Sequence, residues 1–441
     1  MRCHARFLAA LALGLASSTA AQAQPYTFTT IAGSVGNGSY ADGTNGEAHF
    51  TLPTGLSRDT SGNIFVGDLI CNTVREISHI GTFWVVTTPL GVAWSPGADD
   101  GTNASARFDR PASLSFDSKG TMFVFDYTAA NIRKVARIST NFVVTTVAGG
   151  GYSPGYADGT NGEARFSGGC RLAVGKSGNL YVADNWNHAI RQVVLLETNW
   201  IVTTIAGSAG VPGYADGTNK DALFNFPDAI AVDAAENLYV AEMGNCTIRK
   251  MVFDGSNWVV TTIAGDPGVP GSNDGTNASA RFNFPDDIAL DAKGALLVTD
   301  YYNNTVRKVT EIGSDWVVTT IGGVAGQSGS DDGSGTQARF NTPFGIAVDS
   351  TGAIFISDML NYTIRMGRPA VPTLGISTLS GQVILAWPSW ASNYVLETTS
   401  GAISGQQWCA LTNLALLSGE QFFLTNSINI SAAYYRLRKN E

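Results

Sequence analysis

The chain has 441 residues, of which 44% are hydrophobic, 10% aromatic and 14% charged, and it contains 50 glycines. This balance excludes a disordered chain and favours a turn-rich β protein. The formal net charge is −9 and the sequence contains no basic stretch, so it argues against binding to nucleic acid, because an acidic surface repels phosphate backbones.

Residues 1–23 have the pattern of a secretory signal peptide. Arg2 and Arg6 precede an apolar run at residues 7–16, and residues 21–23 form a small-x-small cleavage site. The run is too short to span a bilayer, and no later stretch approaches the roughly 20 apolar residues of a membrane helix. The sequence therefore predicts cleavage near Ala23, no transmembrane segment, and a mature chain that is periplasmic, at the cell surface or secreted.

An Asp-Gly pair recurs six times at a constant interval of 58 residues, as from Asp42 to Asp100. A β-branched residue followed by Arg recurs at the same interval, so whole units repeat and not only a turn. The aspartates are Asp42, Asp100, Asp158, Asp216, Asp274 and Asp332, and the arginines are Arg75, Arg133, Arg191, Arg249, Arg307 and Arg365.

Each unit predicts four short strands. In the copy that starts at Trp258 these are residues 259–265, 287–291, 296–300 and 305–309, each rich in aliphatic residues and bounded by turn residues. A period of about 40 to 60 residues with four strands is typical of a β-propeller blade. The predicted fold class is therefore all-β, a six-bladed β-propeller of four-stranded blades. Residues 26–33 match an outer strand, so this N-terminal strand is predicted to close the last blade and remove an open edge.

The repeated pattern resembles the NHL repeat. The copy that follows Pro227 contains IAVD at residues 230–233, LYVA at 238–241 and IRK at 248–250, with Glu242 where the family usually has Asp. The resemblance extends from Tyr26 to about Arg368 and implies an NHL-repeat six-bladed propeller of the secreted bacterial type, at residues 24–368. It implies a fold and no particular reaction.

The period stops near Pro369 and Pro372, so residues 369–372 are predicted to be a linker. Residues 373–441 alternate again at 383–387, 394–398 and 422–425. This second module resembles the small fibronectin type III-like modules of secreted bacterial proteins, which implies a small β-sandwich-like domain at the C-terminus.

One face of the predicted propeller carries the longer loops, because the loop after the second strand and the loop between blades emerge on the same side. This loop-rich face includes Trp186, His188, Tyr301 and Tyr302. It is the predicted surface for a protein, glycan or small-molecule ligand.

The residue after the proline that begins each inner strand should lie nearest the axis on this face. Neighbouring blades then place Asp228 beside Asp286, with Asp287 next in sequence and Arg171 one blade away. Converging carboxylates can hold a hard cation such as Ca²⁺ or accept the hydroxyls of a sugar, and the alternative is that they bind loop amides. The sequence requires no cofactor, and Asp228 and Asp286 are its candidate ligands for Ca²⁺. The axial set is Thr54, Ala112, Cys170, Asp228, Asp286 and Phe344.

The charges and rings that repeat in every unit are predicted to be structural, since a catalytic group is needed once. An acid after the second strand should form an ion pair with the third-strand arginine or cap a turn. The glycine of each Asp-Gly turn should supply a positive φ while its aspartate accepts bonds from its own loop, and the ring that opens the outer strand should pack between blades. The acids are Asp68, Asp126, Asp184, Glu242, Asp300 and Asp358, and the rings are Trp84, Phe142, Trp200, Trp258 and Trp316.

Four cysteines follow the predicted cleavage site, and their positions fit neither a disulfide framework nor a zinc site. They are expected to be mostly free and buried. They are Cys71, Cys170, Cys246 and Cys409.

Relatives with this fold include a zinc-dependent lyase and calcium-dependent gluconolactonase-like hydrolases. The lyase chemistry is disfavoured, because His49, His79 and His188 occupy three unrelated positions of the repeat. No nucleophile elbow or phosphate loop is present. The sequence therefore favours an exported, non-enzymatic binding scaffold. The alternative is a divalent-metal-dependent lactonase-like hydrolase with an axial carboxylate site at Asp228 and Asp286, and a third hypothesis is a structural envelope protein.

Overall fold

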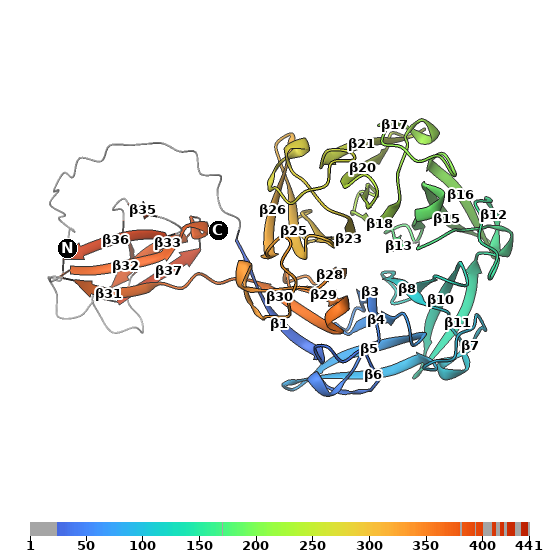
Figure 1. The fold of residues 1–441 in the computed structure, drawn as a ribbon, viewed down its shortest axis with the longest axis horizontal. Coiled ribbons are helices and arrows are strands. Elements are labelled where there is room, and N and C mark those ends of the chain that lie inside the picture. Colours follow the sequence, from blue (N-terminus) through green and yellow to red (C-terminus); the bar gives the residue numbers. More distant parts are fainter. Residues whose placement is uncertain are drawn as a thin grey trace. The chain divides into compact units, whose positions relative to one another are not determined.

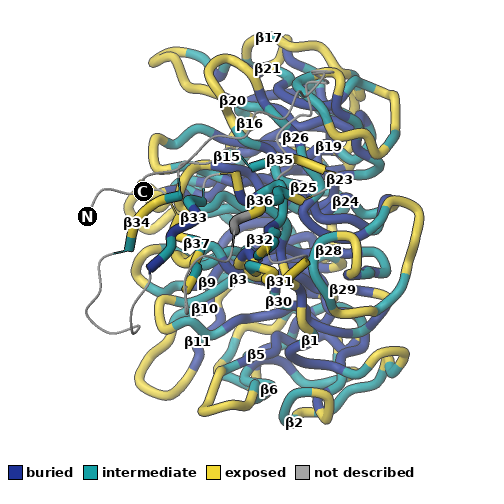
Figure 2. Tube along the Cα trace, turned by 90° about the vertical axis from the view of Figure 1, so that its left-hand side faces the viewer, coloured by how far each residue is buried: buried dark blue, intermediate teal, exposed yellow. Residues whose placement is uncertain are grey.

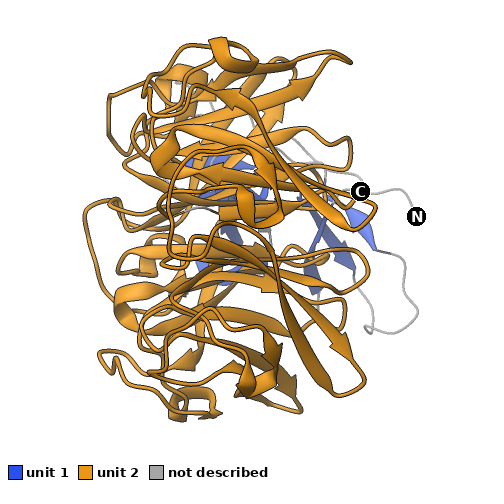
Figure 3. Ribbon diagram, turned by 90° about the vertical axis from the view of Figure 1, so that its right-hand side faces the viewer, with its two compact units in different colours: residues 1–24, 371–441 blue, residues 25–370 orange. Residues whose placement is uncertain are grey.

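The computed structural model describes residues 24–169, 171–379, 382–392, 394–399, 408–411, 415–418, 421–427 and 434–439. Residues 25–370 form one compact unit, and residues 371–441 belong to a second (Figure 3). The predicted signal peptide and Cys170 lie outside the described residues. In the part of the chain that is described, no helix has the length and apolarity needed to cross a membrane.

The larger unit contains six antiparallel sheets of five strands, which follow one another around a ring (Figure 1). From the axis outward, the first three sheets are β3 (Pro53–Arg58), β4 (Ile64–Asp68), β5 (Thr73–Ile80), β6 (Phe83–Gly91) and β2 (Gly43–Thr44); β8 (Pro111–Phe116), β9 (Met122–Asp126), β10 (Asn131–Ile138), β11 (Asn141–Ala148) and β7 (Gly101–Thr102); and β13 (Arg171–Val174), β14 (Leu180–Asp184), β15 (Ala189–Leu196), β16 (Asn199–Gly207) and β12 (Gly159–Thr160). The other three are β18 (Pro227–Val232), β19 (Leu238–Glu242), β20 (Thr247–Phe253), β21 (Trp258–Ala264) and β17 (Gly217–Thr218); β23 (Pro285–Leu290), β24 (Leu296–Asp300), β25 (Thr305–Ile312), β26 (Asp315–Gly323) and β22 (Gly275–Thr276); and β28 (Pro343–Val348), β29 (Ile354–Asp358), β30 (Thr363–Pro369), β1 (Tyr26–Gly33) and β27 (Gly333–Ser334).

The innermost strands close the ring. Each contacts the innermost strands of both neighbouring sheets, in the cyclic order β3, β8, β13, β18, β23 and β28, and β28 contacts β3 again. The N-terminal strand β1 pairs antiparallel with β30, as the sequence predicted. Figure 2 shows that buried residues follow the strands and exposed residues gather in the loops.

The sequence predicted four strands in each sheet, and this count was wrong. The fifth strand is the residue pair after each repeated aspartate, which is Gly-Thr in five copies and Gly333–Ser334 in the sixth. In the third sheet, Gly159 pairs with Val202 and Thr160 with Ile201. Two residues are too few to show the alternation that reveals a strand in a sequence. Short 3₁₀ turns follow these strands or the second strands, and one lies in the smaller unit: η1 (Asn45–Glu47), η2 (Asn103–Ser105), η3 (Asn161–Glu163), η4 (Asn185–Asn187), η5 (Asn219–Asp221), η6 (Asn277–Ser279), η7 (Gly335–Gln337), η8 (Met359–Asn361) and η9 (Ser389–Ala391).

A buried arginine holds each sheet together. In the third sheet, Arg191 donates through Nη1 to Asp184 and through Nη2 to Asp158, at 2.7 Å in both cases. Its guanidinium also lies over the Phe166 ring, 5.4 Å from the centroid. The predicted ion pair between the second-strand acid and the third-strand arginine is confirmed in all six sheets.

The Asp-Gly turns act differently from the prediction. Asp158 accepts hydrogen bonds from the backbone N and hydroxyl of Thr204 in the outer strand, at 3.0 and 2.9 Å, and not from its own loop. Of the six turn glycines, only Gly159 and Gly333 have the predicted positive φ, at 159° and 154°, and these angles lie close to the extended conformation. Glycine is needed for space, since a Cβ on Gly101 would lie 2.6 Å from Ser105 Oγ.

The rings that open the outer strands pack between sheets, as predicted. Trp258 contacts Tyr181 of the preceding sheet at a centroid distance of 5.9 Å, and Trp316 contacts Tyr239 at the same distance. Trp84, Phe142 and Trp200 make equivalent contacts.

In the described part of the smaller unit, two sheets share one core. One sheet has the order β31 (Gly375–Leu379), β32 (Gln382–Pro388), β36 (Gln421–Ser427) and β35 (Leu416–Ser418), and the other has β34 (Cys409–Ala410), β33 (Tyr394–Thr399) and β37 (Tyr434–Lys439). Leu385 and Leu424 of the first sheet and Leu396 of the second are buried in the same cluster.

Candidate functional site

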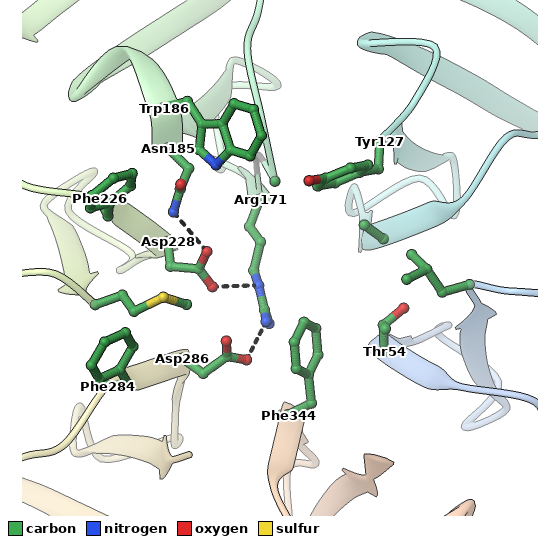
Figure 4. Close-up of a pocket in the computed structure, with 14 residues that line it drawn as sticks. Thr54, Tyr127, Arg171, Asn185, Trp186, Phe226, Asp228, Phe284, Asp286 and Phe344 are labelled. Atoms are coloured by element: carbon green, nitrogen blue, oxygen red, sulfur yellow. Dashed lines mark hydrogen bonds and ion pairs between the residues drawn. The ribbon is translucent and has the colours of Figure 1, made fainter. Parts of the chain in front are cut away.

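A pocket of about 390 Å³ lies over the axis of the ring, where the innermost strands begin (Figure 4). A proline starts five of these strands, and the side chain that follows it lines the pocket. The sequence placed these residues nearest the axis, and the five described members of that set line the pocket: Thr54, Ala112, Asp228, Asp286 and Phe344. Arg171, the first residue of β13, takes the place in the third sheet.

Most of the remaining wall is apolar. Its side chains follow a second strand or precede the proline of an inner strand. Trp186 is 57% exposed and Phe226 is 40% exposed, so both rings are open to solvent at the rim. The wall consists of Leu69, Tyr127, Trp186, Phe226, Met243 and Phe284, with Gly169 and Asn185.

Arg171 is buried among three carboxylates at the base of the pocket. Its Nε lies 3.2 Å from Asp228 Oδ2 and its Nη1 lies 3.0 Å from Asp287 Oδ2, while its Nη2 pairs with Asp286 Oδ2. The guanidinium carbon is 4.2 Å from the centroid of the Phe344 ring. One side chain of β13 therefore connects β18, β23 and β28.

β-Bulges aim these acids at the guanidinium. Successive side chains of a regular strand point to opposite faces, yet Asp286 and Asp287 both reach Arg171. The register of β23 against β24 shifts between Pro285 and Asp287, and β18 has the same shift around Asp228. An extra residue in a strand redirects a side chain, which explains how neighbouring acids converge here.

A second cavity of about 390 Å³ lies further along the innermost strands. Arg171 lines both cavities, whereas Asp228 and Asp286 line only the first and Asp287 lines only the second. Asp287 also accepts a hydrogen bond from the backbone N of Ile346 in β28, at 2.9 Å. The guanidinium of Arg171 therefore lies between the two cavities.

Burial and neighbouring charges shift the pKa values of Asp228, Asp286 and Arg171. Burial raises the pKa of Asp228 to about 6, against the opposing effect of Arg171. Burial also raises the pKa of Asp286 well above its ordinary value, again opposed by Arg171, and the charges of Asp228 and Asp287 add to the increase. For Arg171, the attraction of the three carboxylates outweighs burial and raises the pKa, so the guanidinium stays charged.

Three predicted residues lie outside the pocket and contact its rings. His188 Nδ1 accepts a hydrogen bond from the backbone N of Phe226 at 3.1 Å, and burial lowers the pKa of this histidine. Tyr301 lies 6.3 Å from Phe344, and Tyr302 lies 4.6 Å from Phe284, between ring centroids. Of the predicted site residues, the structure brings together Arg171, Trp186, Asp228 and Asp286 at the pocket, with Asp287 on its far side.

The carboxylates as arranged do not fit a calcium ion. Within the described ranges, no group of three or more His, Cys, Asp or Glu side chains is placed to hold a metal. The Arg171 guanidinium lies among Asp228, Asp286 and Asp287, where the sequence analysis placed a cation. Burial raises the pKa of all three acids, which disfavours their joint ionisation.

Sequence reasoning missed several wall residues. Phe226 and Phe284 each precede the proline of an inner strand, and this repeated Phe-Pro pair is a signal that could have identified them. Tyr127 follows its second strand at the position next to that of Trp186, so the segment that supplied one ring also supplies the other. Asn185 donates to Asp228 Oδ1 at 2.9 Å, a contact that the repeat does not encode.

Comparison with known proteins defines the class. Residues 282–309 match the NHL repeat family. The chain therefore contains an NHL repeat within a propeller-like all-β fold.

The chain is similar to two longer proteins over part of their length. It is 26% identical to Protein SUPPRESSOR OF QUENCHING 1, chloroplastic, of Arabidopsis thaliana over 71% of this chain and 32% of that protein. It is 25% identical to NHL repeat-containing protein 2 of Gallus gallus over 62% of this chain and 40% of that protein. The chain thus spans well under half of the length of these two relatives.

Two solved structures share the fold. An auxiliary nutrient binding protein from Bacteroides ovatus superposes with a TM-score of 0.58 and 18% identity, over 79% of this chain and 78% of that one. A Bacteroides thetaiotaomicron protein of unknown function superposes with a TM-score of 0.59 and 18% identity, over 78% of this chain and 75% of that one. These similarities concern the fold alone.

Proposed function

We propose that this chain is an exported, six-bladed NHL-repeat propeller protein that binds a small-molecule ligand in its axial pocket. The observation that carries the proposal is the pocket itself: about 390 Å³, walled by aromatic rings, with its charged groups gathered on one side. Ligand sites are typically concave and largely apolar, with a few polar groups that orient the ligand. The smaller unit, a fibronectin type III-like β-sandwich in this proposal, serves attachment or spacing.

Two further observations support this function. The secretory pattern of residues 1–23 supports export. The fold is shared with proteins described as auxiliary nutrient binding proteins, which supports a binding role.

The lactonase-like alternative is less well supported. A hydrolytic metal would have to displace the Arg171 guanidinium from Asp228 and Asp286. Calorimetric titration with Ca²⁺ tests this alternative directly. One tight site that Asp228→Ala abolishes would favour the hydrolase over the binding protein.

The binding function is tested by a thermal-shift screen of the mature protein against monosaccharides, amino acids and aromatic amines. We expect at least one class to raise the melting temperature, and Trp186→Ala to remove most of that shift. Tyr156→Ala is the matched control, because Tyr156 is an exposed ring, 66% accessible, that does not line the pocket. A ligand that binds equally well to Trp186→Ala, or a screen without any binder, would contradict the proposal.

A further inference from the structure

Three residues of the pocket have a buried polar atom without a hydrogen bond: Asp228 Oδ2, Arg171 Nη1 and Asp286 Oδ1. The first two atoms take part in ion pairs, whereas no ion pair of the described residues involves Asp286 Oδ1. The side chain of Asp286 is buried and lines the pocket, and Oδ2 pairs with Arg171. Among the described residues, Oδ1 accepts no hydrogen bond. A buried carboxylate oxygen without a donor is costly, so this atom needs either a proton shared with the neighbouring Asp228 carboxyl or a donor from a ligand.

The charges around Asp286 do not balance. The three carboxylates of Asp228, Asp286 and Asp287 pair with the one guanidinium of Arg171. With every group ionised, the cluster carries three negative charges and one positive charge, a net charge of −2. No second basic side chain of the described residues forms an ion pair with these acids. Charges interact strongly at a buried site, so this excess favours a cation.

The wall above these acids suits the body of such a cation. Trp186 and Phe226 are the most exposed of its rings, and aromatic faces attract organic cations. A sugar would need several polar partners, yet the Asn185 amide is already bound to Asp228 at 2.9 Å. In Figure 4 the charged groups lie together while rings occupy the other sides of the pocket.

We infer that the pocket binds an amphipathic primary amine, whose ammonium group donates to Asp286 Oδ1 and whose apolar body contacts Trp186 and Phe226. This inference rests on the proposed function and names the ligand class. An anionic or hydroxyl-rich ligand would leave the excess negative charge uncompensated.

Binding of the amine is linked to release of a proton. Burial, together with the charges of Asp228 and Asp287, outweighs Arg171 and raises the pKa of Asp286, so this carboxyl keeps its proton to a higher pH than an ordinary aspartate. The hydroxyl of Tyr301 is the other titratable group that interacts with Asp286. An ammonium group that takes the place of the proton expels it to solvent, so affinity should rise with pH until the amine itself loses its charge.

Three probes with one apolar body test the inference by calorimetry at pH 7.5: 2-phenylethylammonium, 2-phenylethanol and 3-phenylpropionate. We expect the ammonium compound to bind at least ten-fold more tightly than the alcohol, and the carboxylate to bind most weakly. The binding heat should change with the ionisation enthalpy of the buffer, because a proton is released. At pH 5 the affinity for the ammonium compound should fall.

Asp286→Asn should abolish the preference for the ammonium compound. Asp331→Asn is the matched control, because Asp331 is an exposed aspartate that does not line the pocket, and it should keep the preference. If the ammonium compound and the alcohol bind equally, the pocket still binds ligands and the inference fails alone. If none of the three probes binds, the inference is overturned, and the screen with Trp186→Ala decides the proposed function separately. If Asp286→Asn does not fold, the relative affinities of the three probes for the wild-type protein still show whether the pocket prefers an ammonium group.

Discussion

The ring of Phe28 fills space that Gly367 leaves open in the strand beside it. A Cβ on Gly367 would lie 2.5 Å from Phe28 Cε1, and a Cβ on Gly322 would lie 2.2 Å from Phe28 Cε2. In the other five copies the position of Phe28 is valine, and the position of Gly367 is Ile77, Val135, Val193, Met251 or Val309. In the sheet where β1 and β30 close the ring, the side chain on β1 is therefore larger and the residue beside it on β30 is smaller than in the other five copies.

This exchange predicts coupled stability effects. Phe28→Val should leave a cavity and Gly367→Val should clash, each lowering the free energy of unfolding by roughly 1–3 kcal/mol. The double variant restores the pair found in other copies and should recover about 1 kcal/mol or more relative to the sum. Urea unfolding measures all three, with Thr29→Ala, an exposed change in the same strand, as control. If the loss in the double variant equals the sum of the two single losses, the Phe28 ring does not depend on the space beside Gly367.

Deletion of residues 26–33 should make the protein insoluble or strongly unstable.

The buried arginines predict a difference between their two acidic partners. Asp184 is fully buried, whereas the Asp158 side chain is 48% exposed. Asp184→Ala leaves Arg191 without its buried partner and should cost about 3–5 kcal/mol, since an uncompensated buried charge is strongly destabilising. Asp158→Ala should cost about 1 kcal/mol or less from the ion pair, because solvent screens it. Guanidinium chloride unfolding measures the stability of both variants. Equal losses of stability would show that the burial of the acid does not determine how much its ion pair contributes.

The pocket acids predict a pH dependence of stability. Asp228 has a pKa of about 6 in the folded protein, above the ordinary value of 3.8, and Asp286 is raised well above 3.8. The folded state therefore binds more protons than the unfolded state, and the contribution of these groups to stability falls as the pH rises through about 6. Asp286→Asn supplies an amide donor in place of the proton. Between pH 5 and pH 8 this variant should lose less stability than the wild type, by about 1 kcal/mol or more.

Melting temperatures at several pH values test this difference. Other buried acids also titrate, including Asp126 with a pKa of about 7, so the comparison between variant and wild type isolates the pocket. Asp331→Asn should retain the wild-type slope. If the melting temperatures of Asp286→Asn and of the wild type change equally with pH, Asp286 does not contribute to the pH dependence of stability.

The thiols should differ in reactivity. Burial, and then the charge of Asp68, raises the pKa of Cys71 to about 12, and burial raises the pKa of Cys246. Cys409 is exposed. Because the thiolate is the reactive form, iodoacetamide at pH 8 should label Cys409 in the native protein and the two buried thiols only after unfolding. Peptide mass spectrometry identifies the labelled sites, and rapid native labelling of Cys71 would contradict its burial.

Much of the ring could be predicted from the sequence, because a constant interval places equivalent residues at equivalent positions. The axial placement of Thr54 and Phe344 followed from that interval alone. The same interval placed Arg171 one blade from Asp228 and Asp286, but it did not predict ion pairs between this arginine and three acids. Those pairs depend on bulges at Asp228 and Asp286 that shift the strand register without changing the repeat length. His188 was placed on the correct face, but its left-handed backbone, with a φ of 55°, accompanies a ring that contacts Phe226 and does not line the pocket.

The position of Arg171 also limits how the ring can be used. Arg171 lines both cavities, and its guanidinium is held by Asp228 and Asp286, which line the first, and by Asp287, which lines the second. A molecule that moved along the axis from one cavity to the other would therefore have to break these ion pairs.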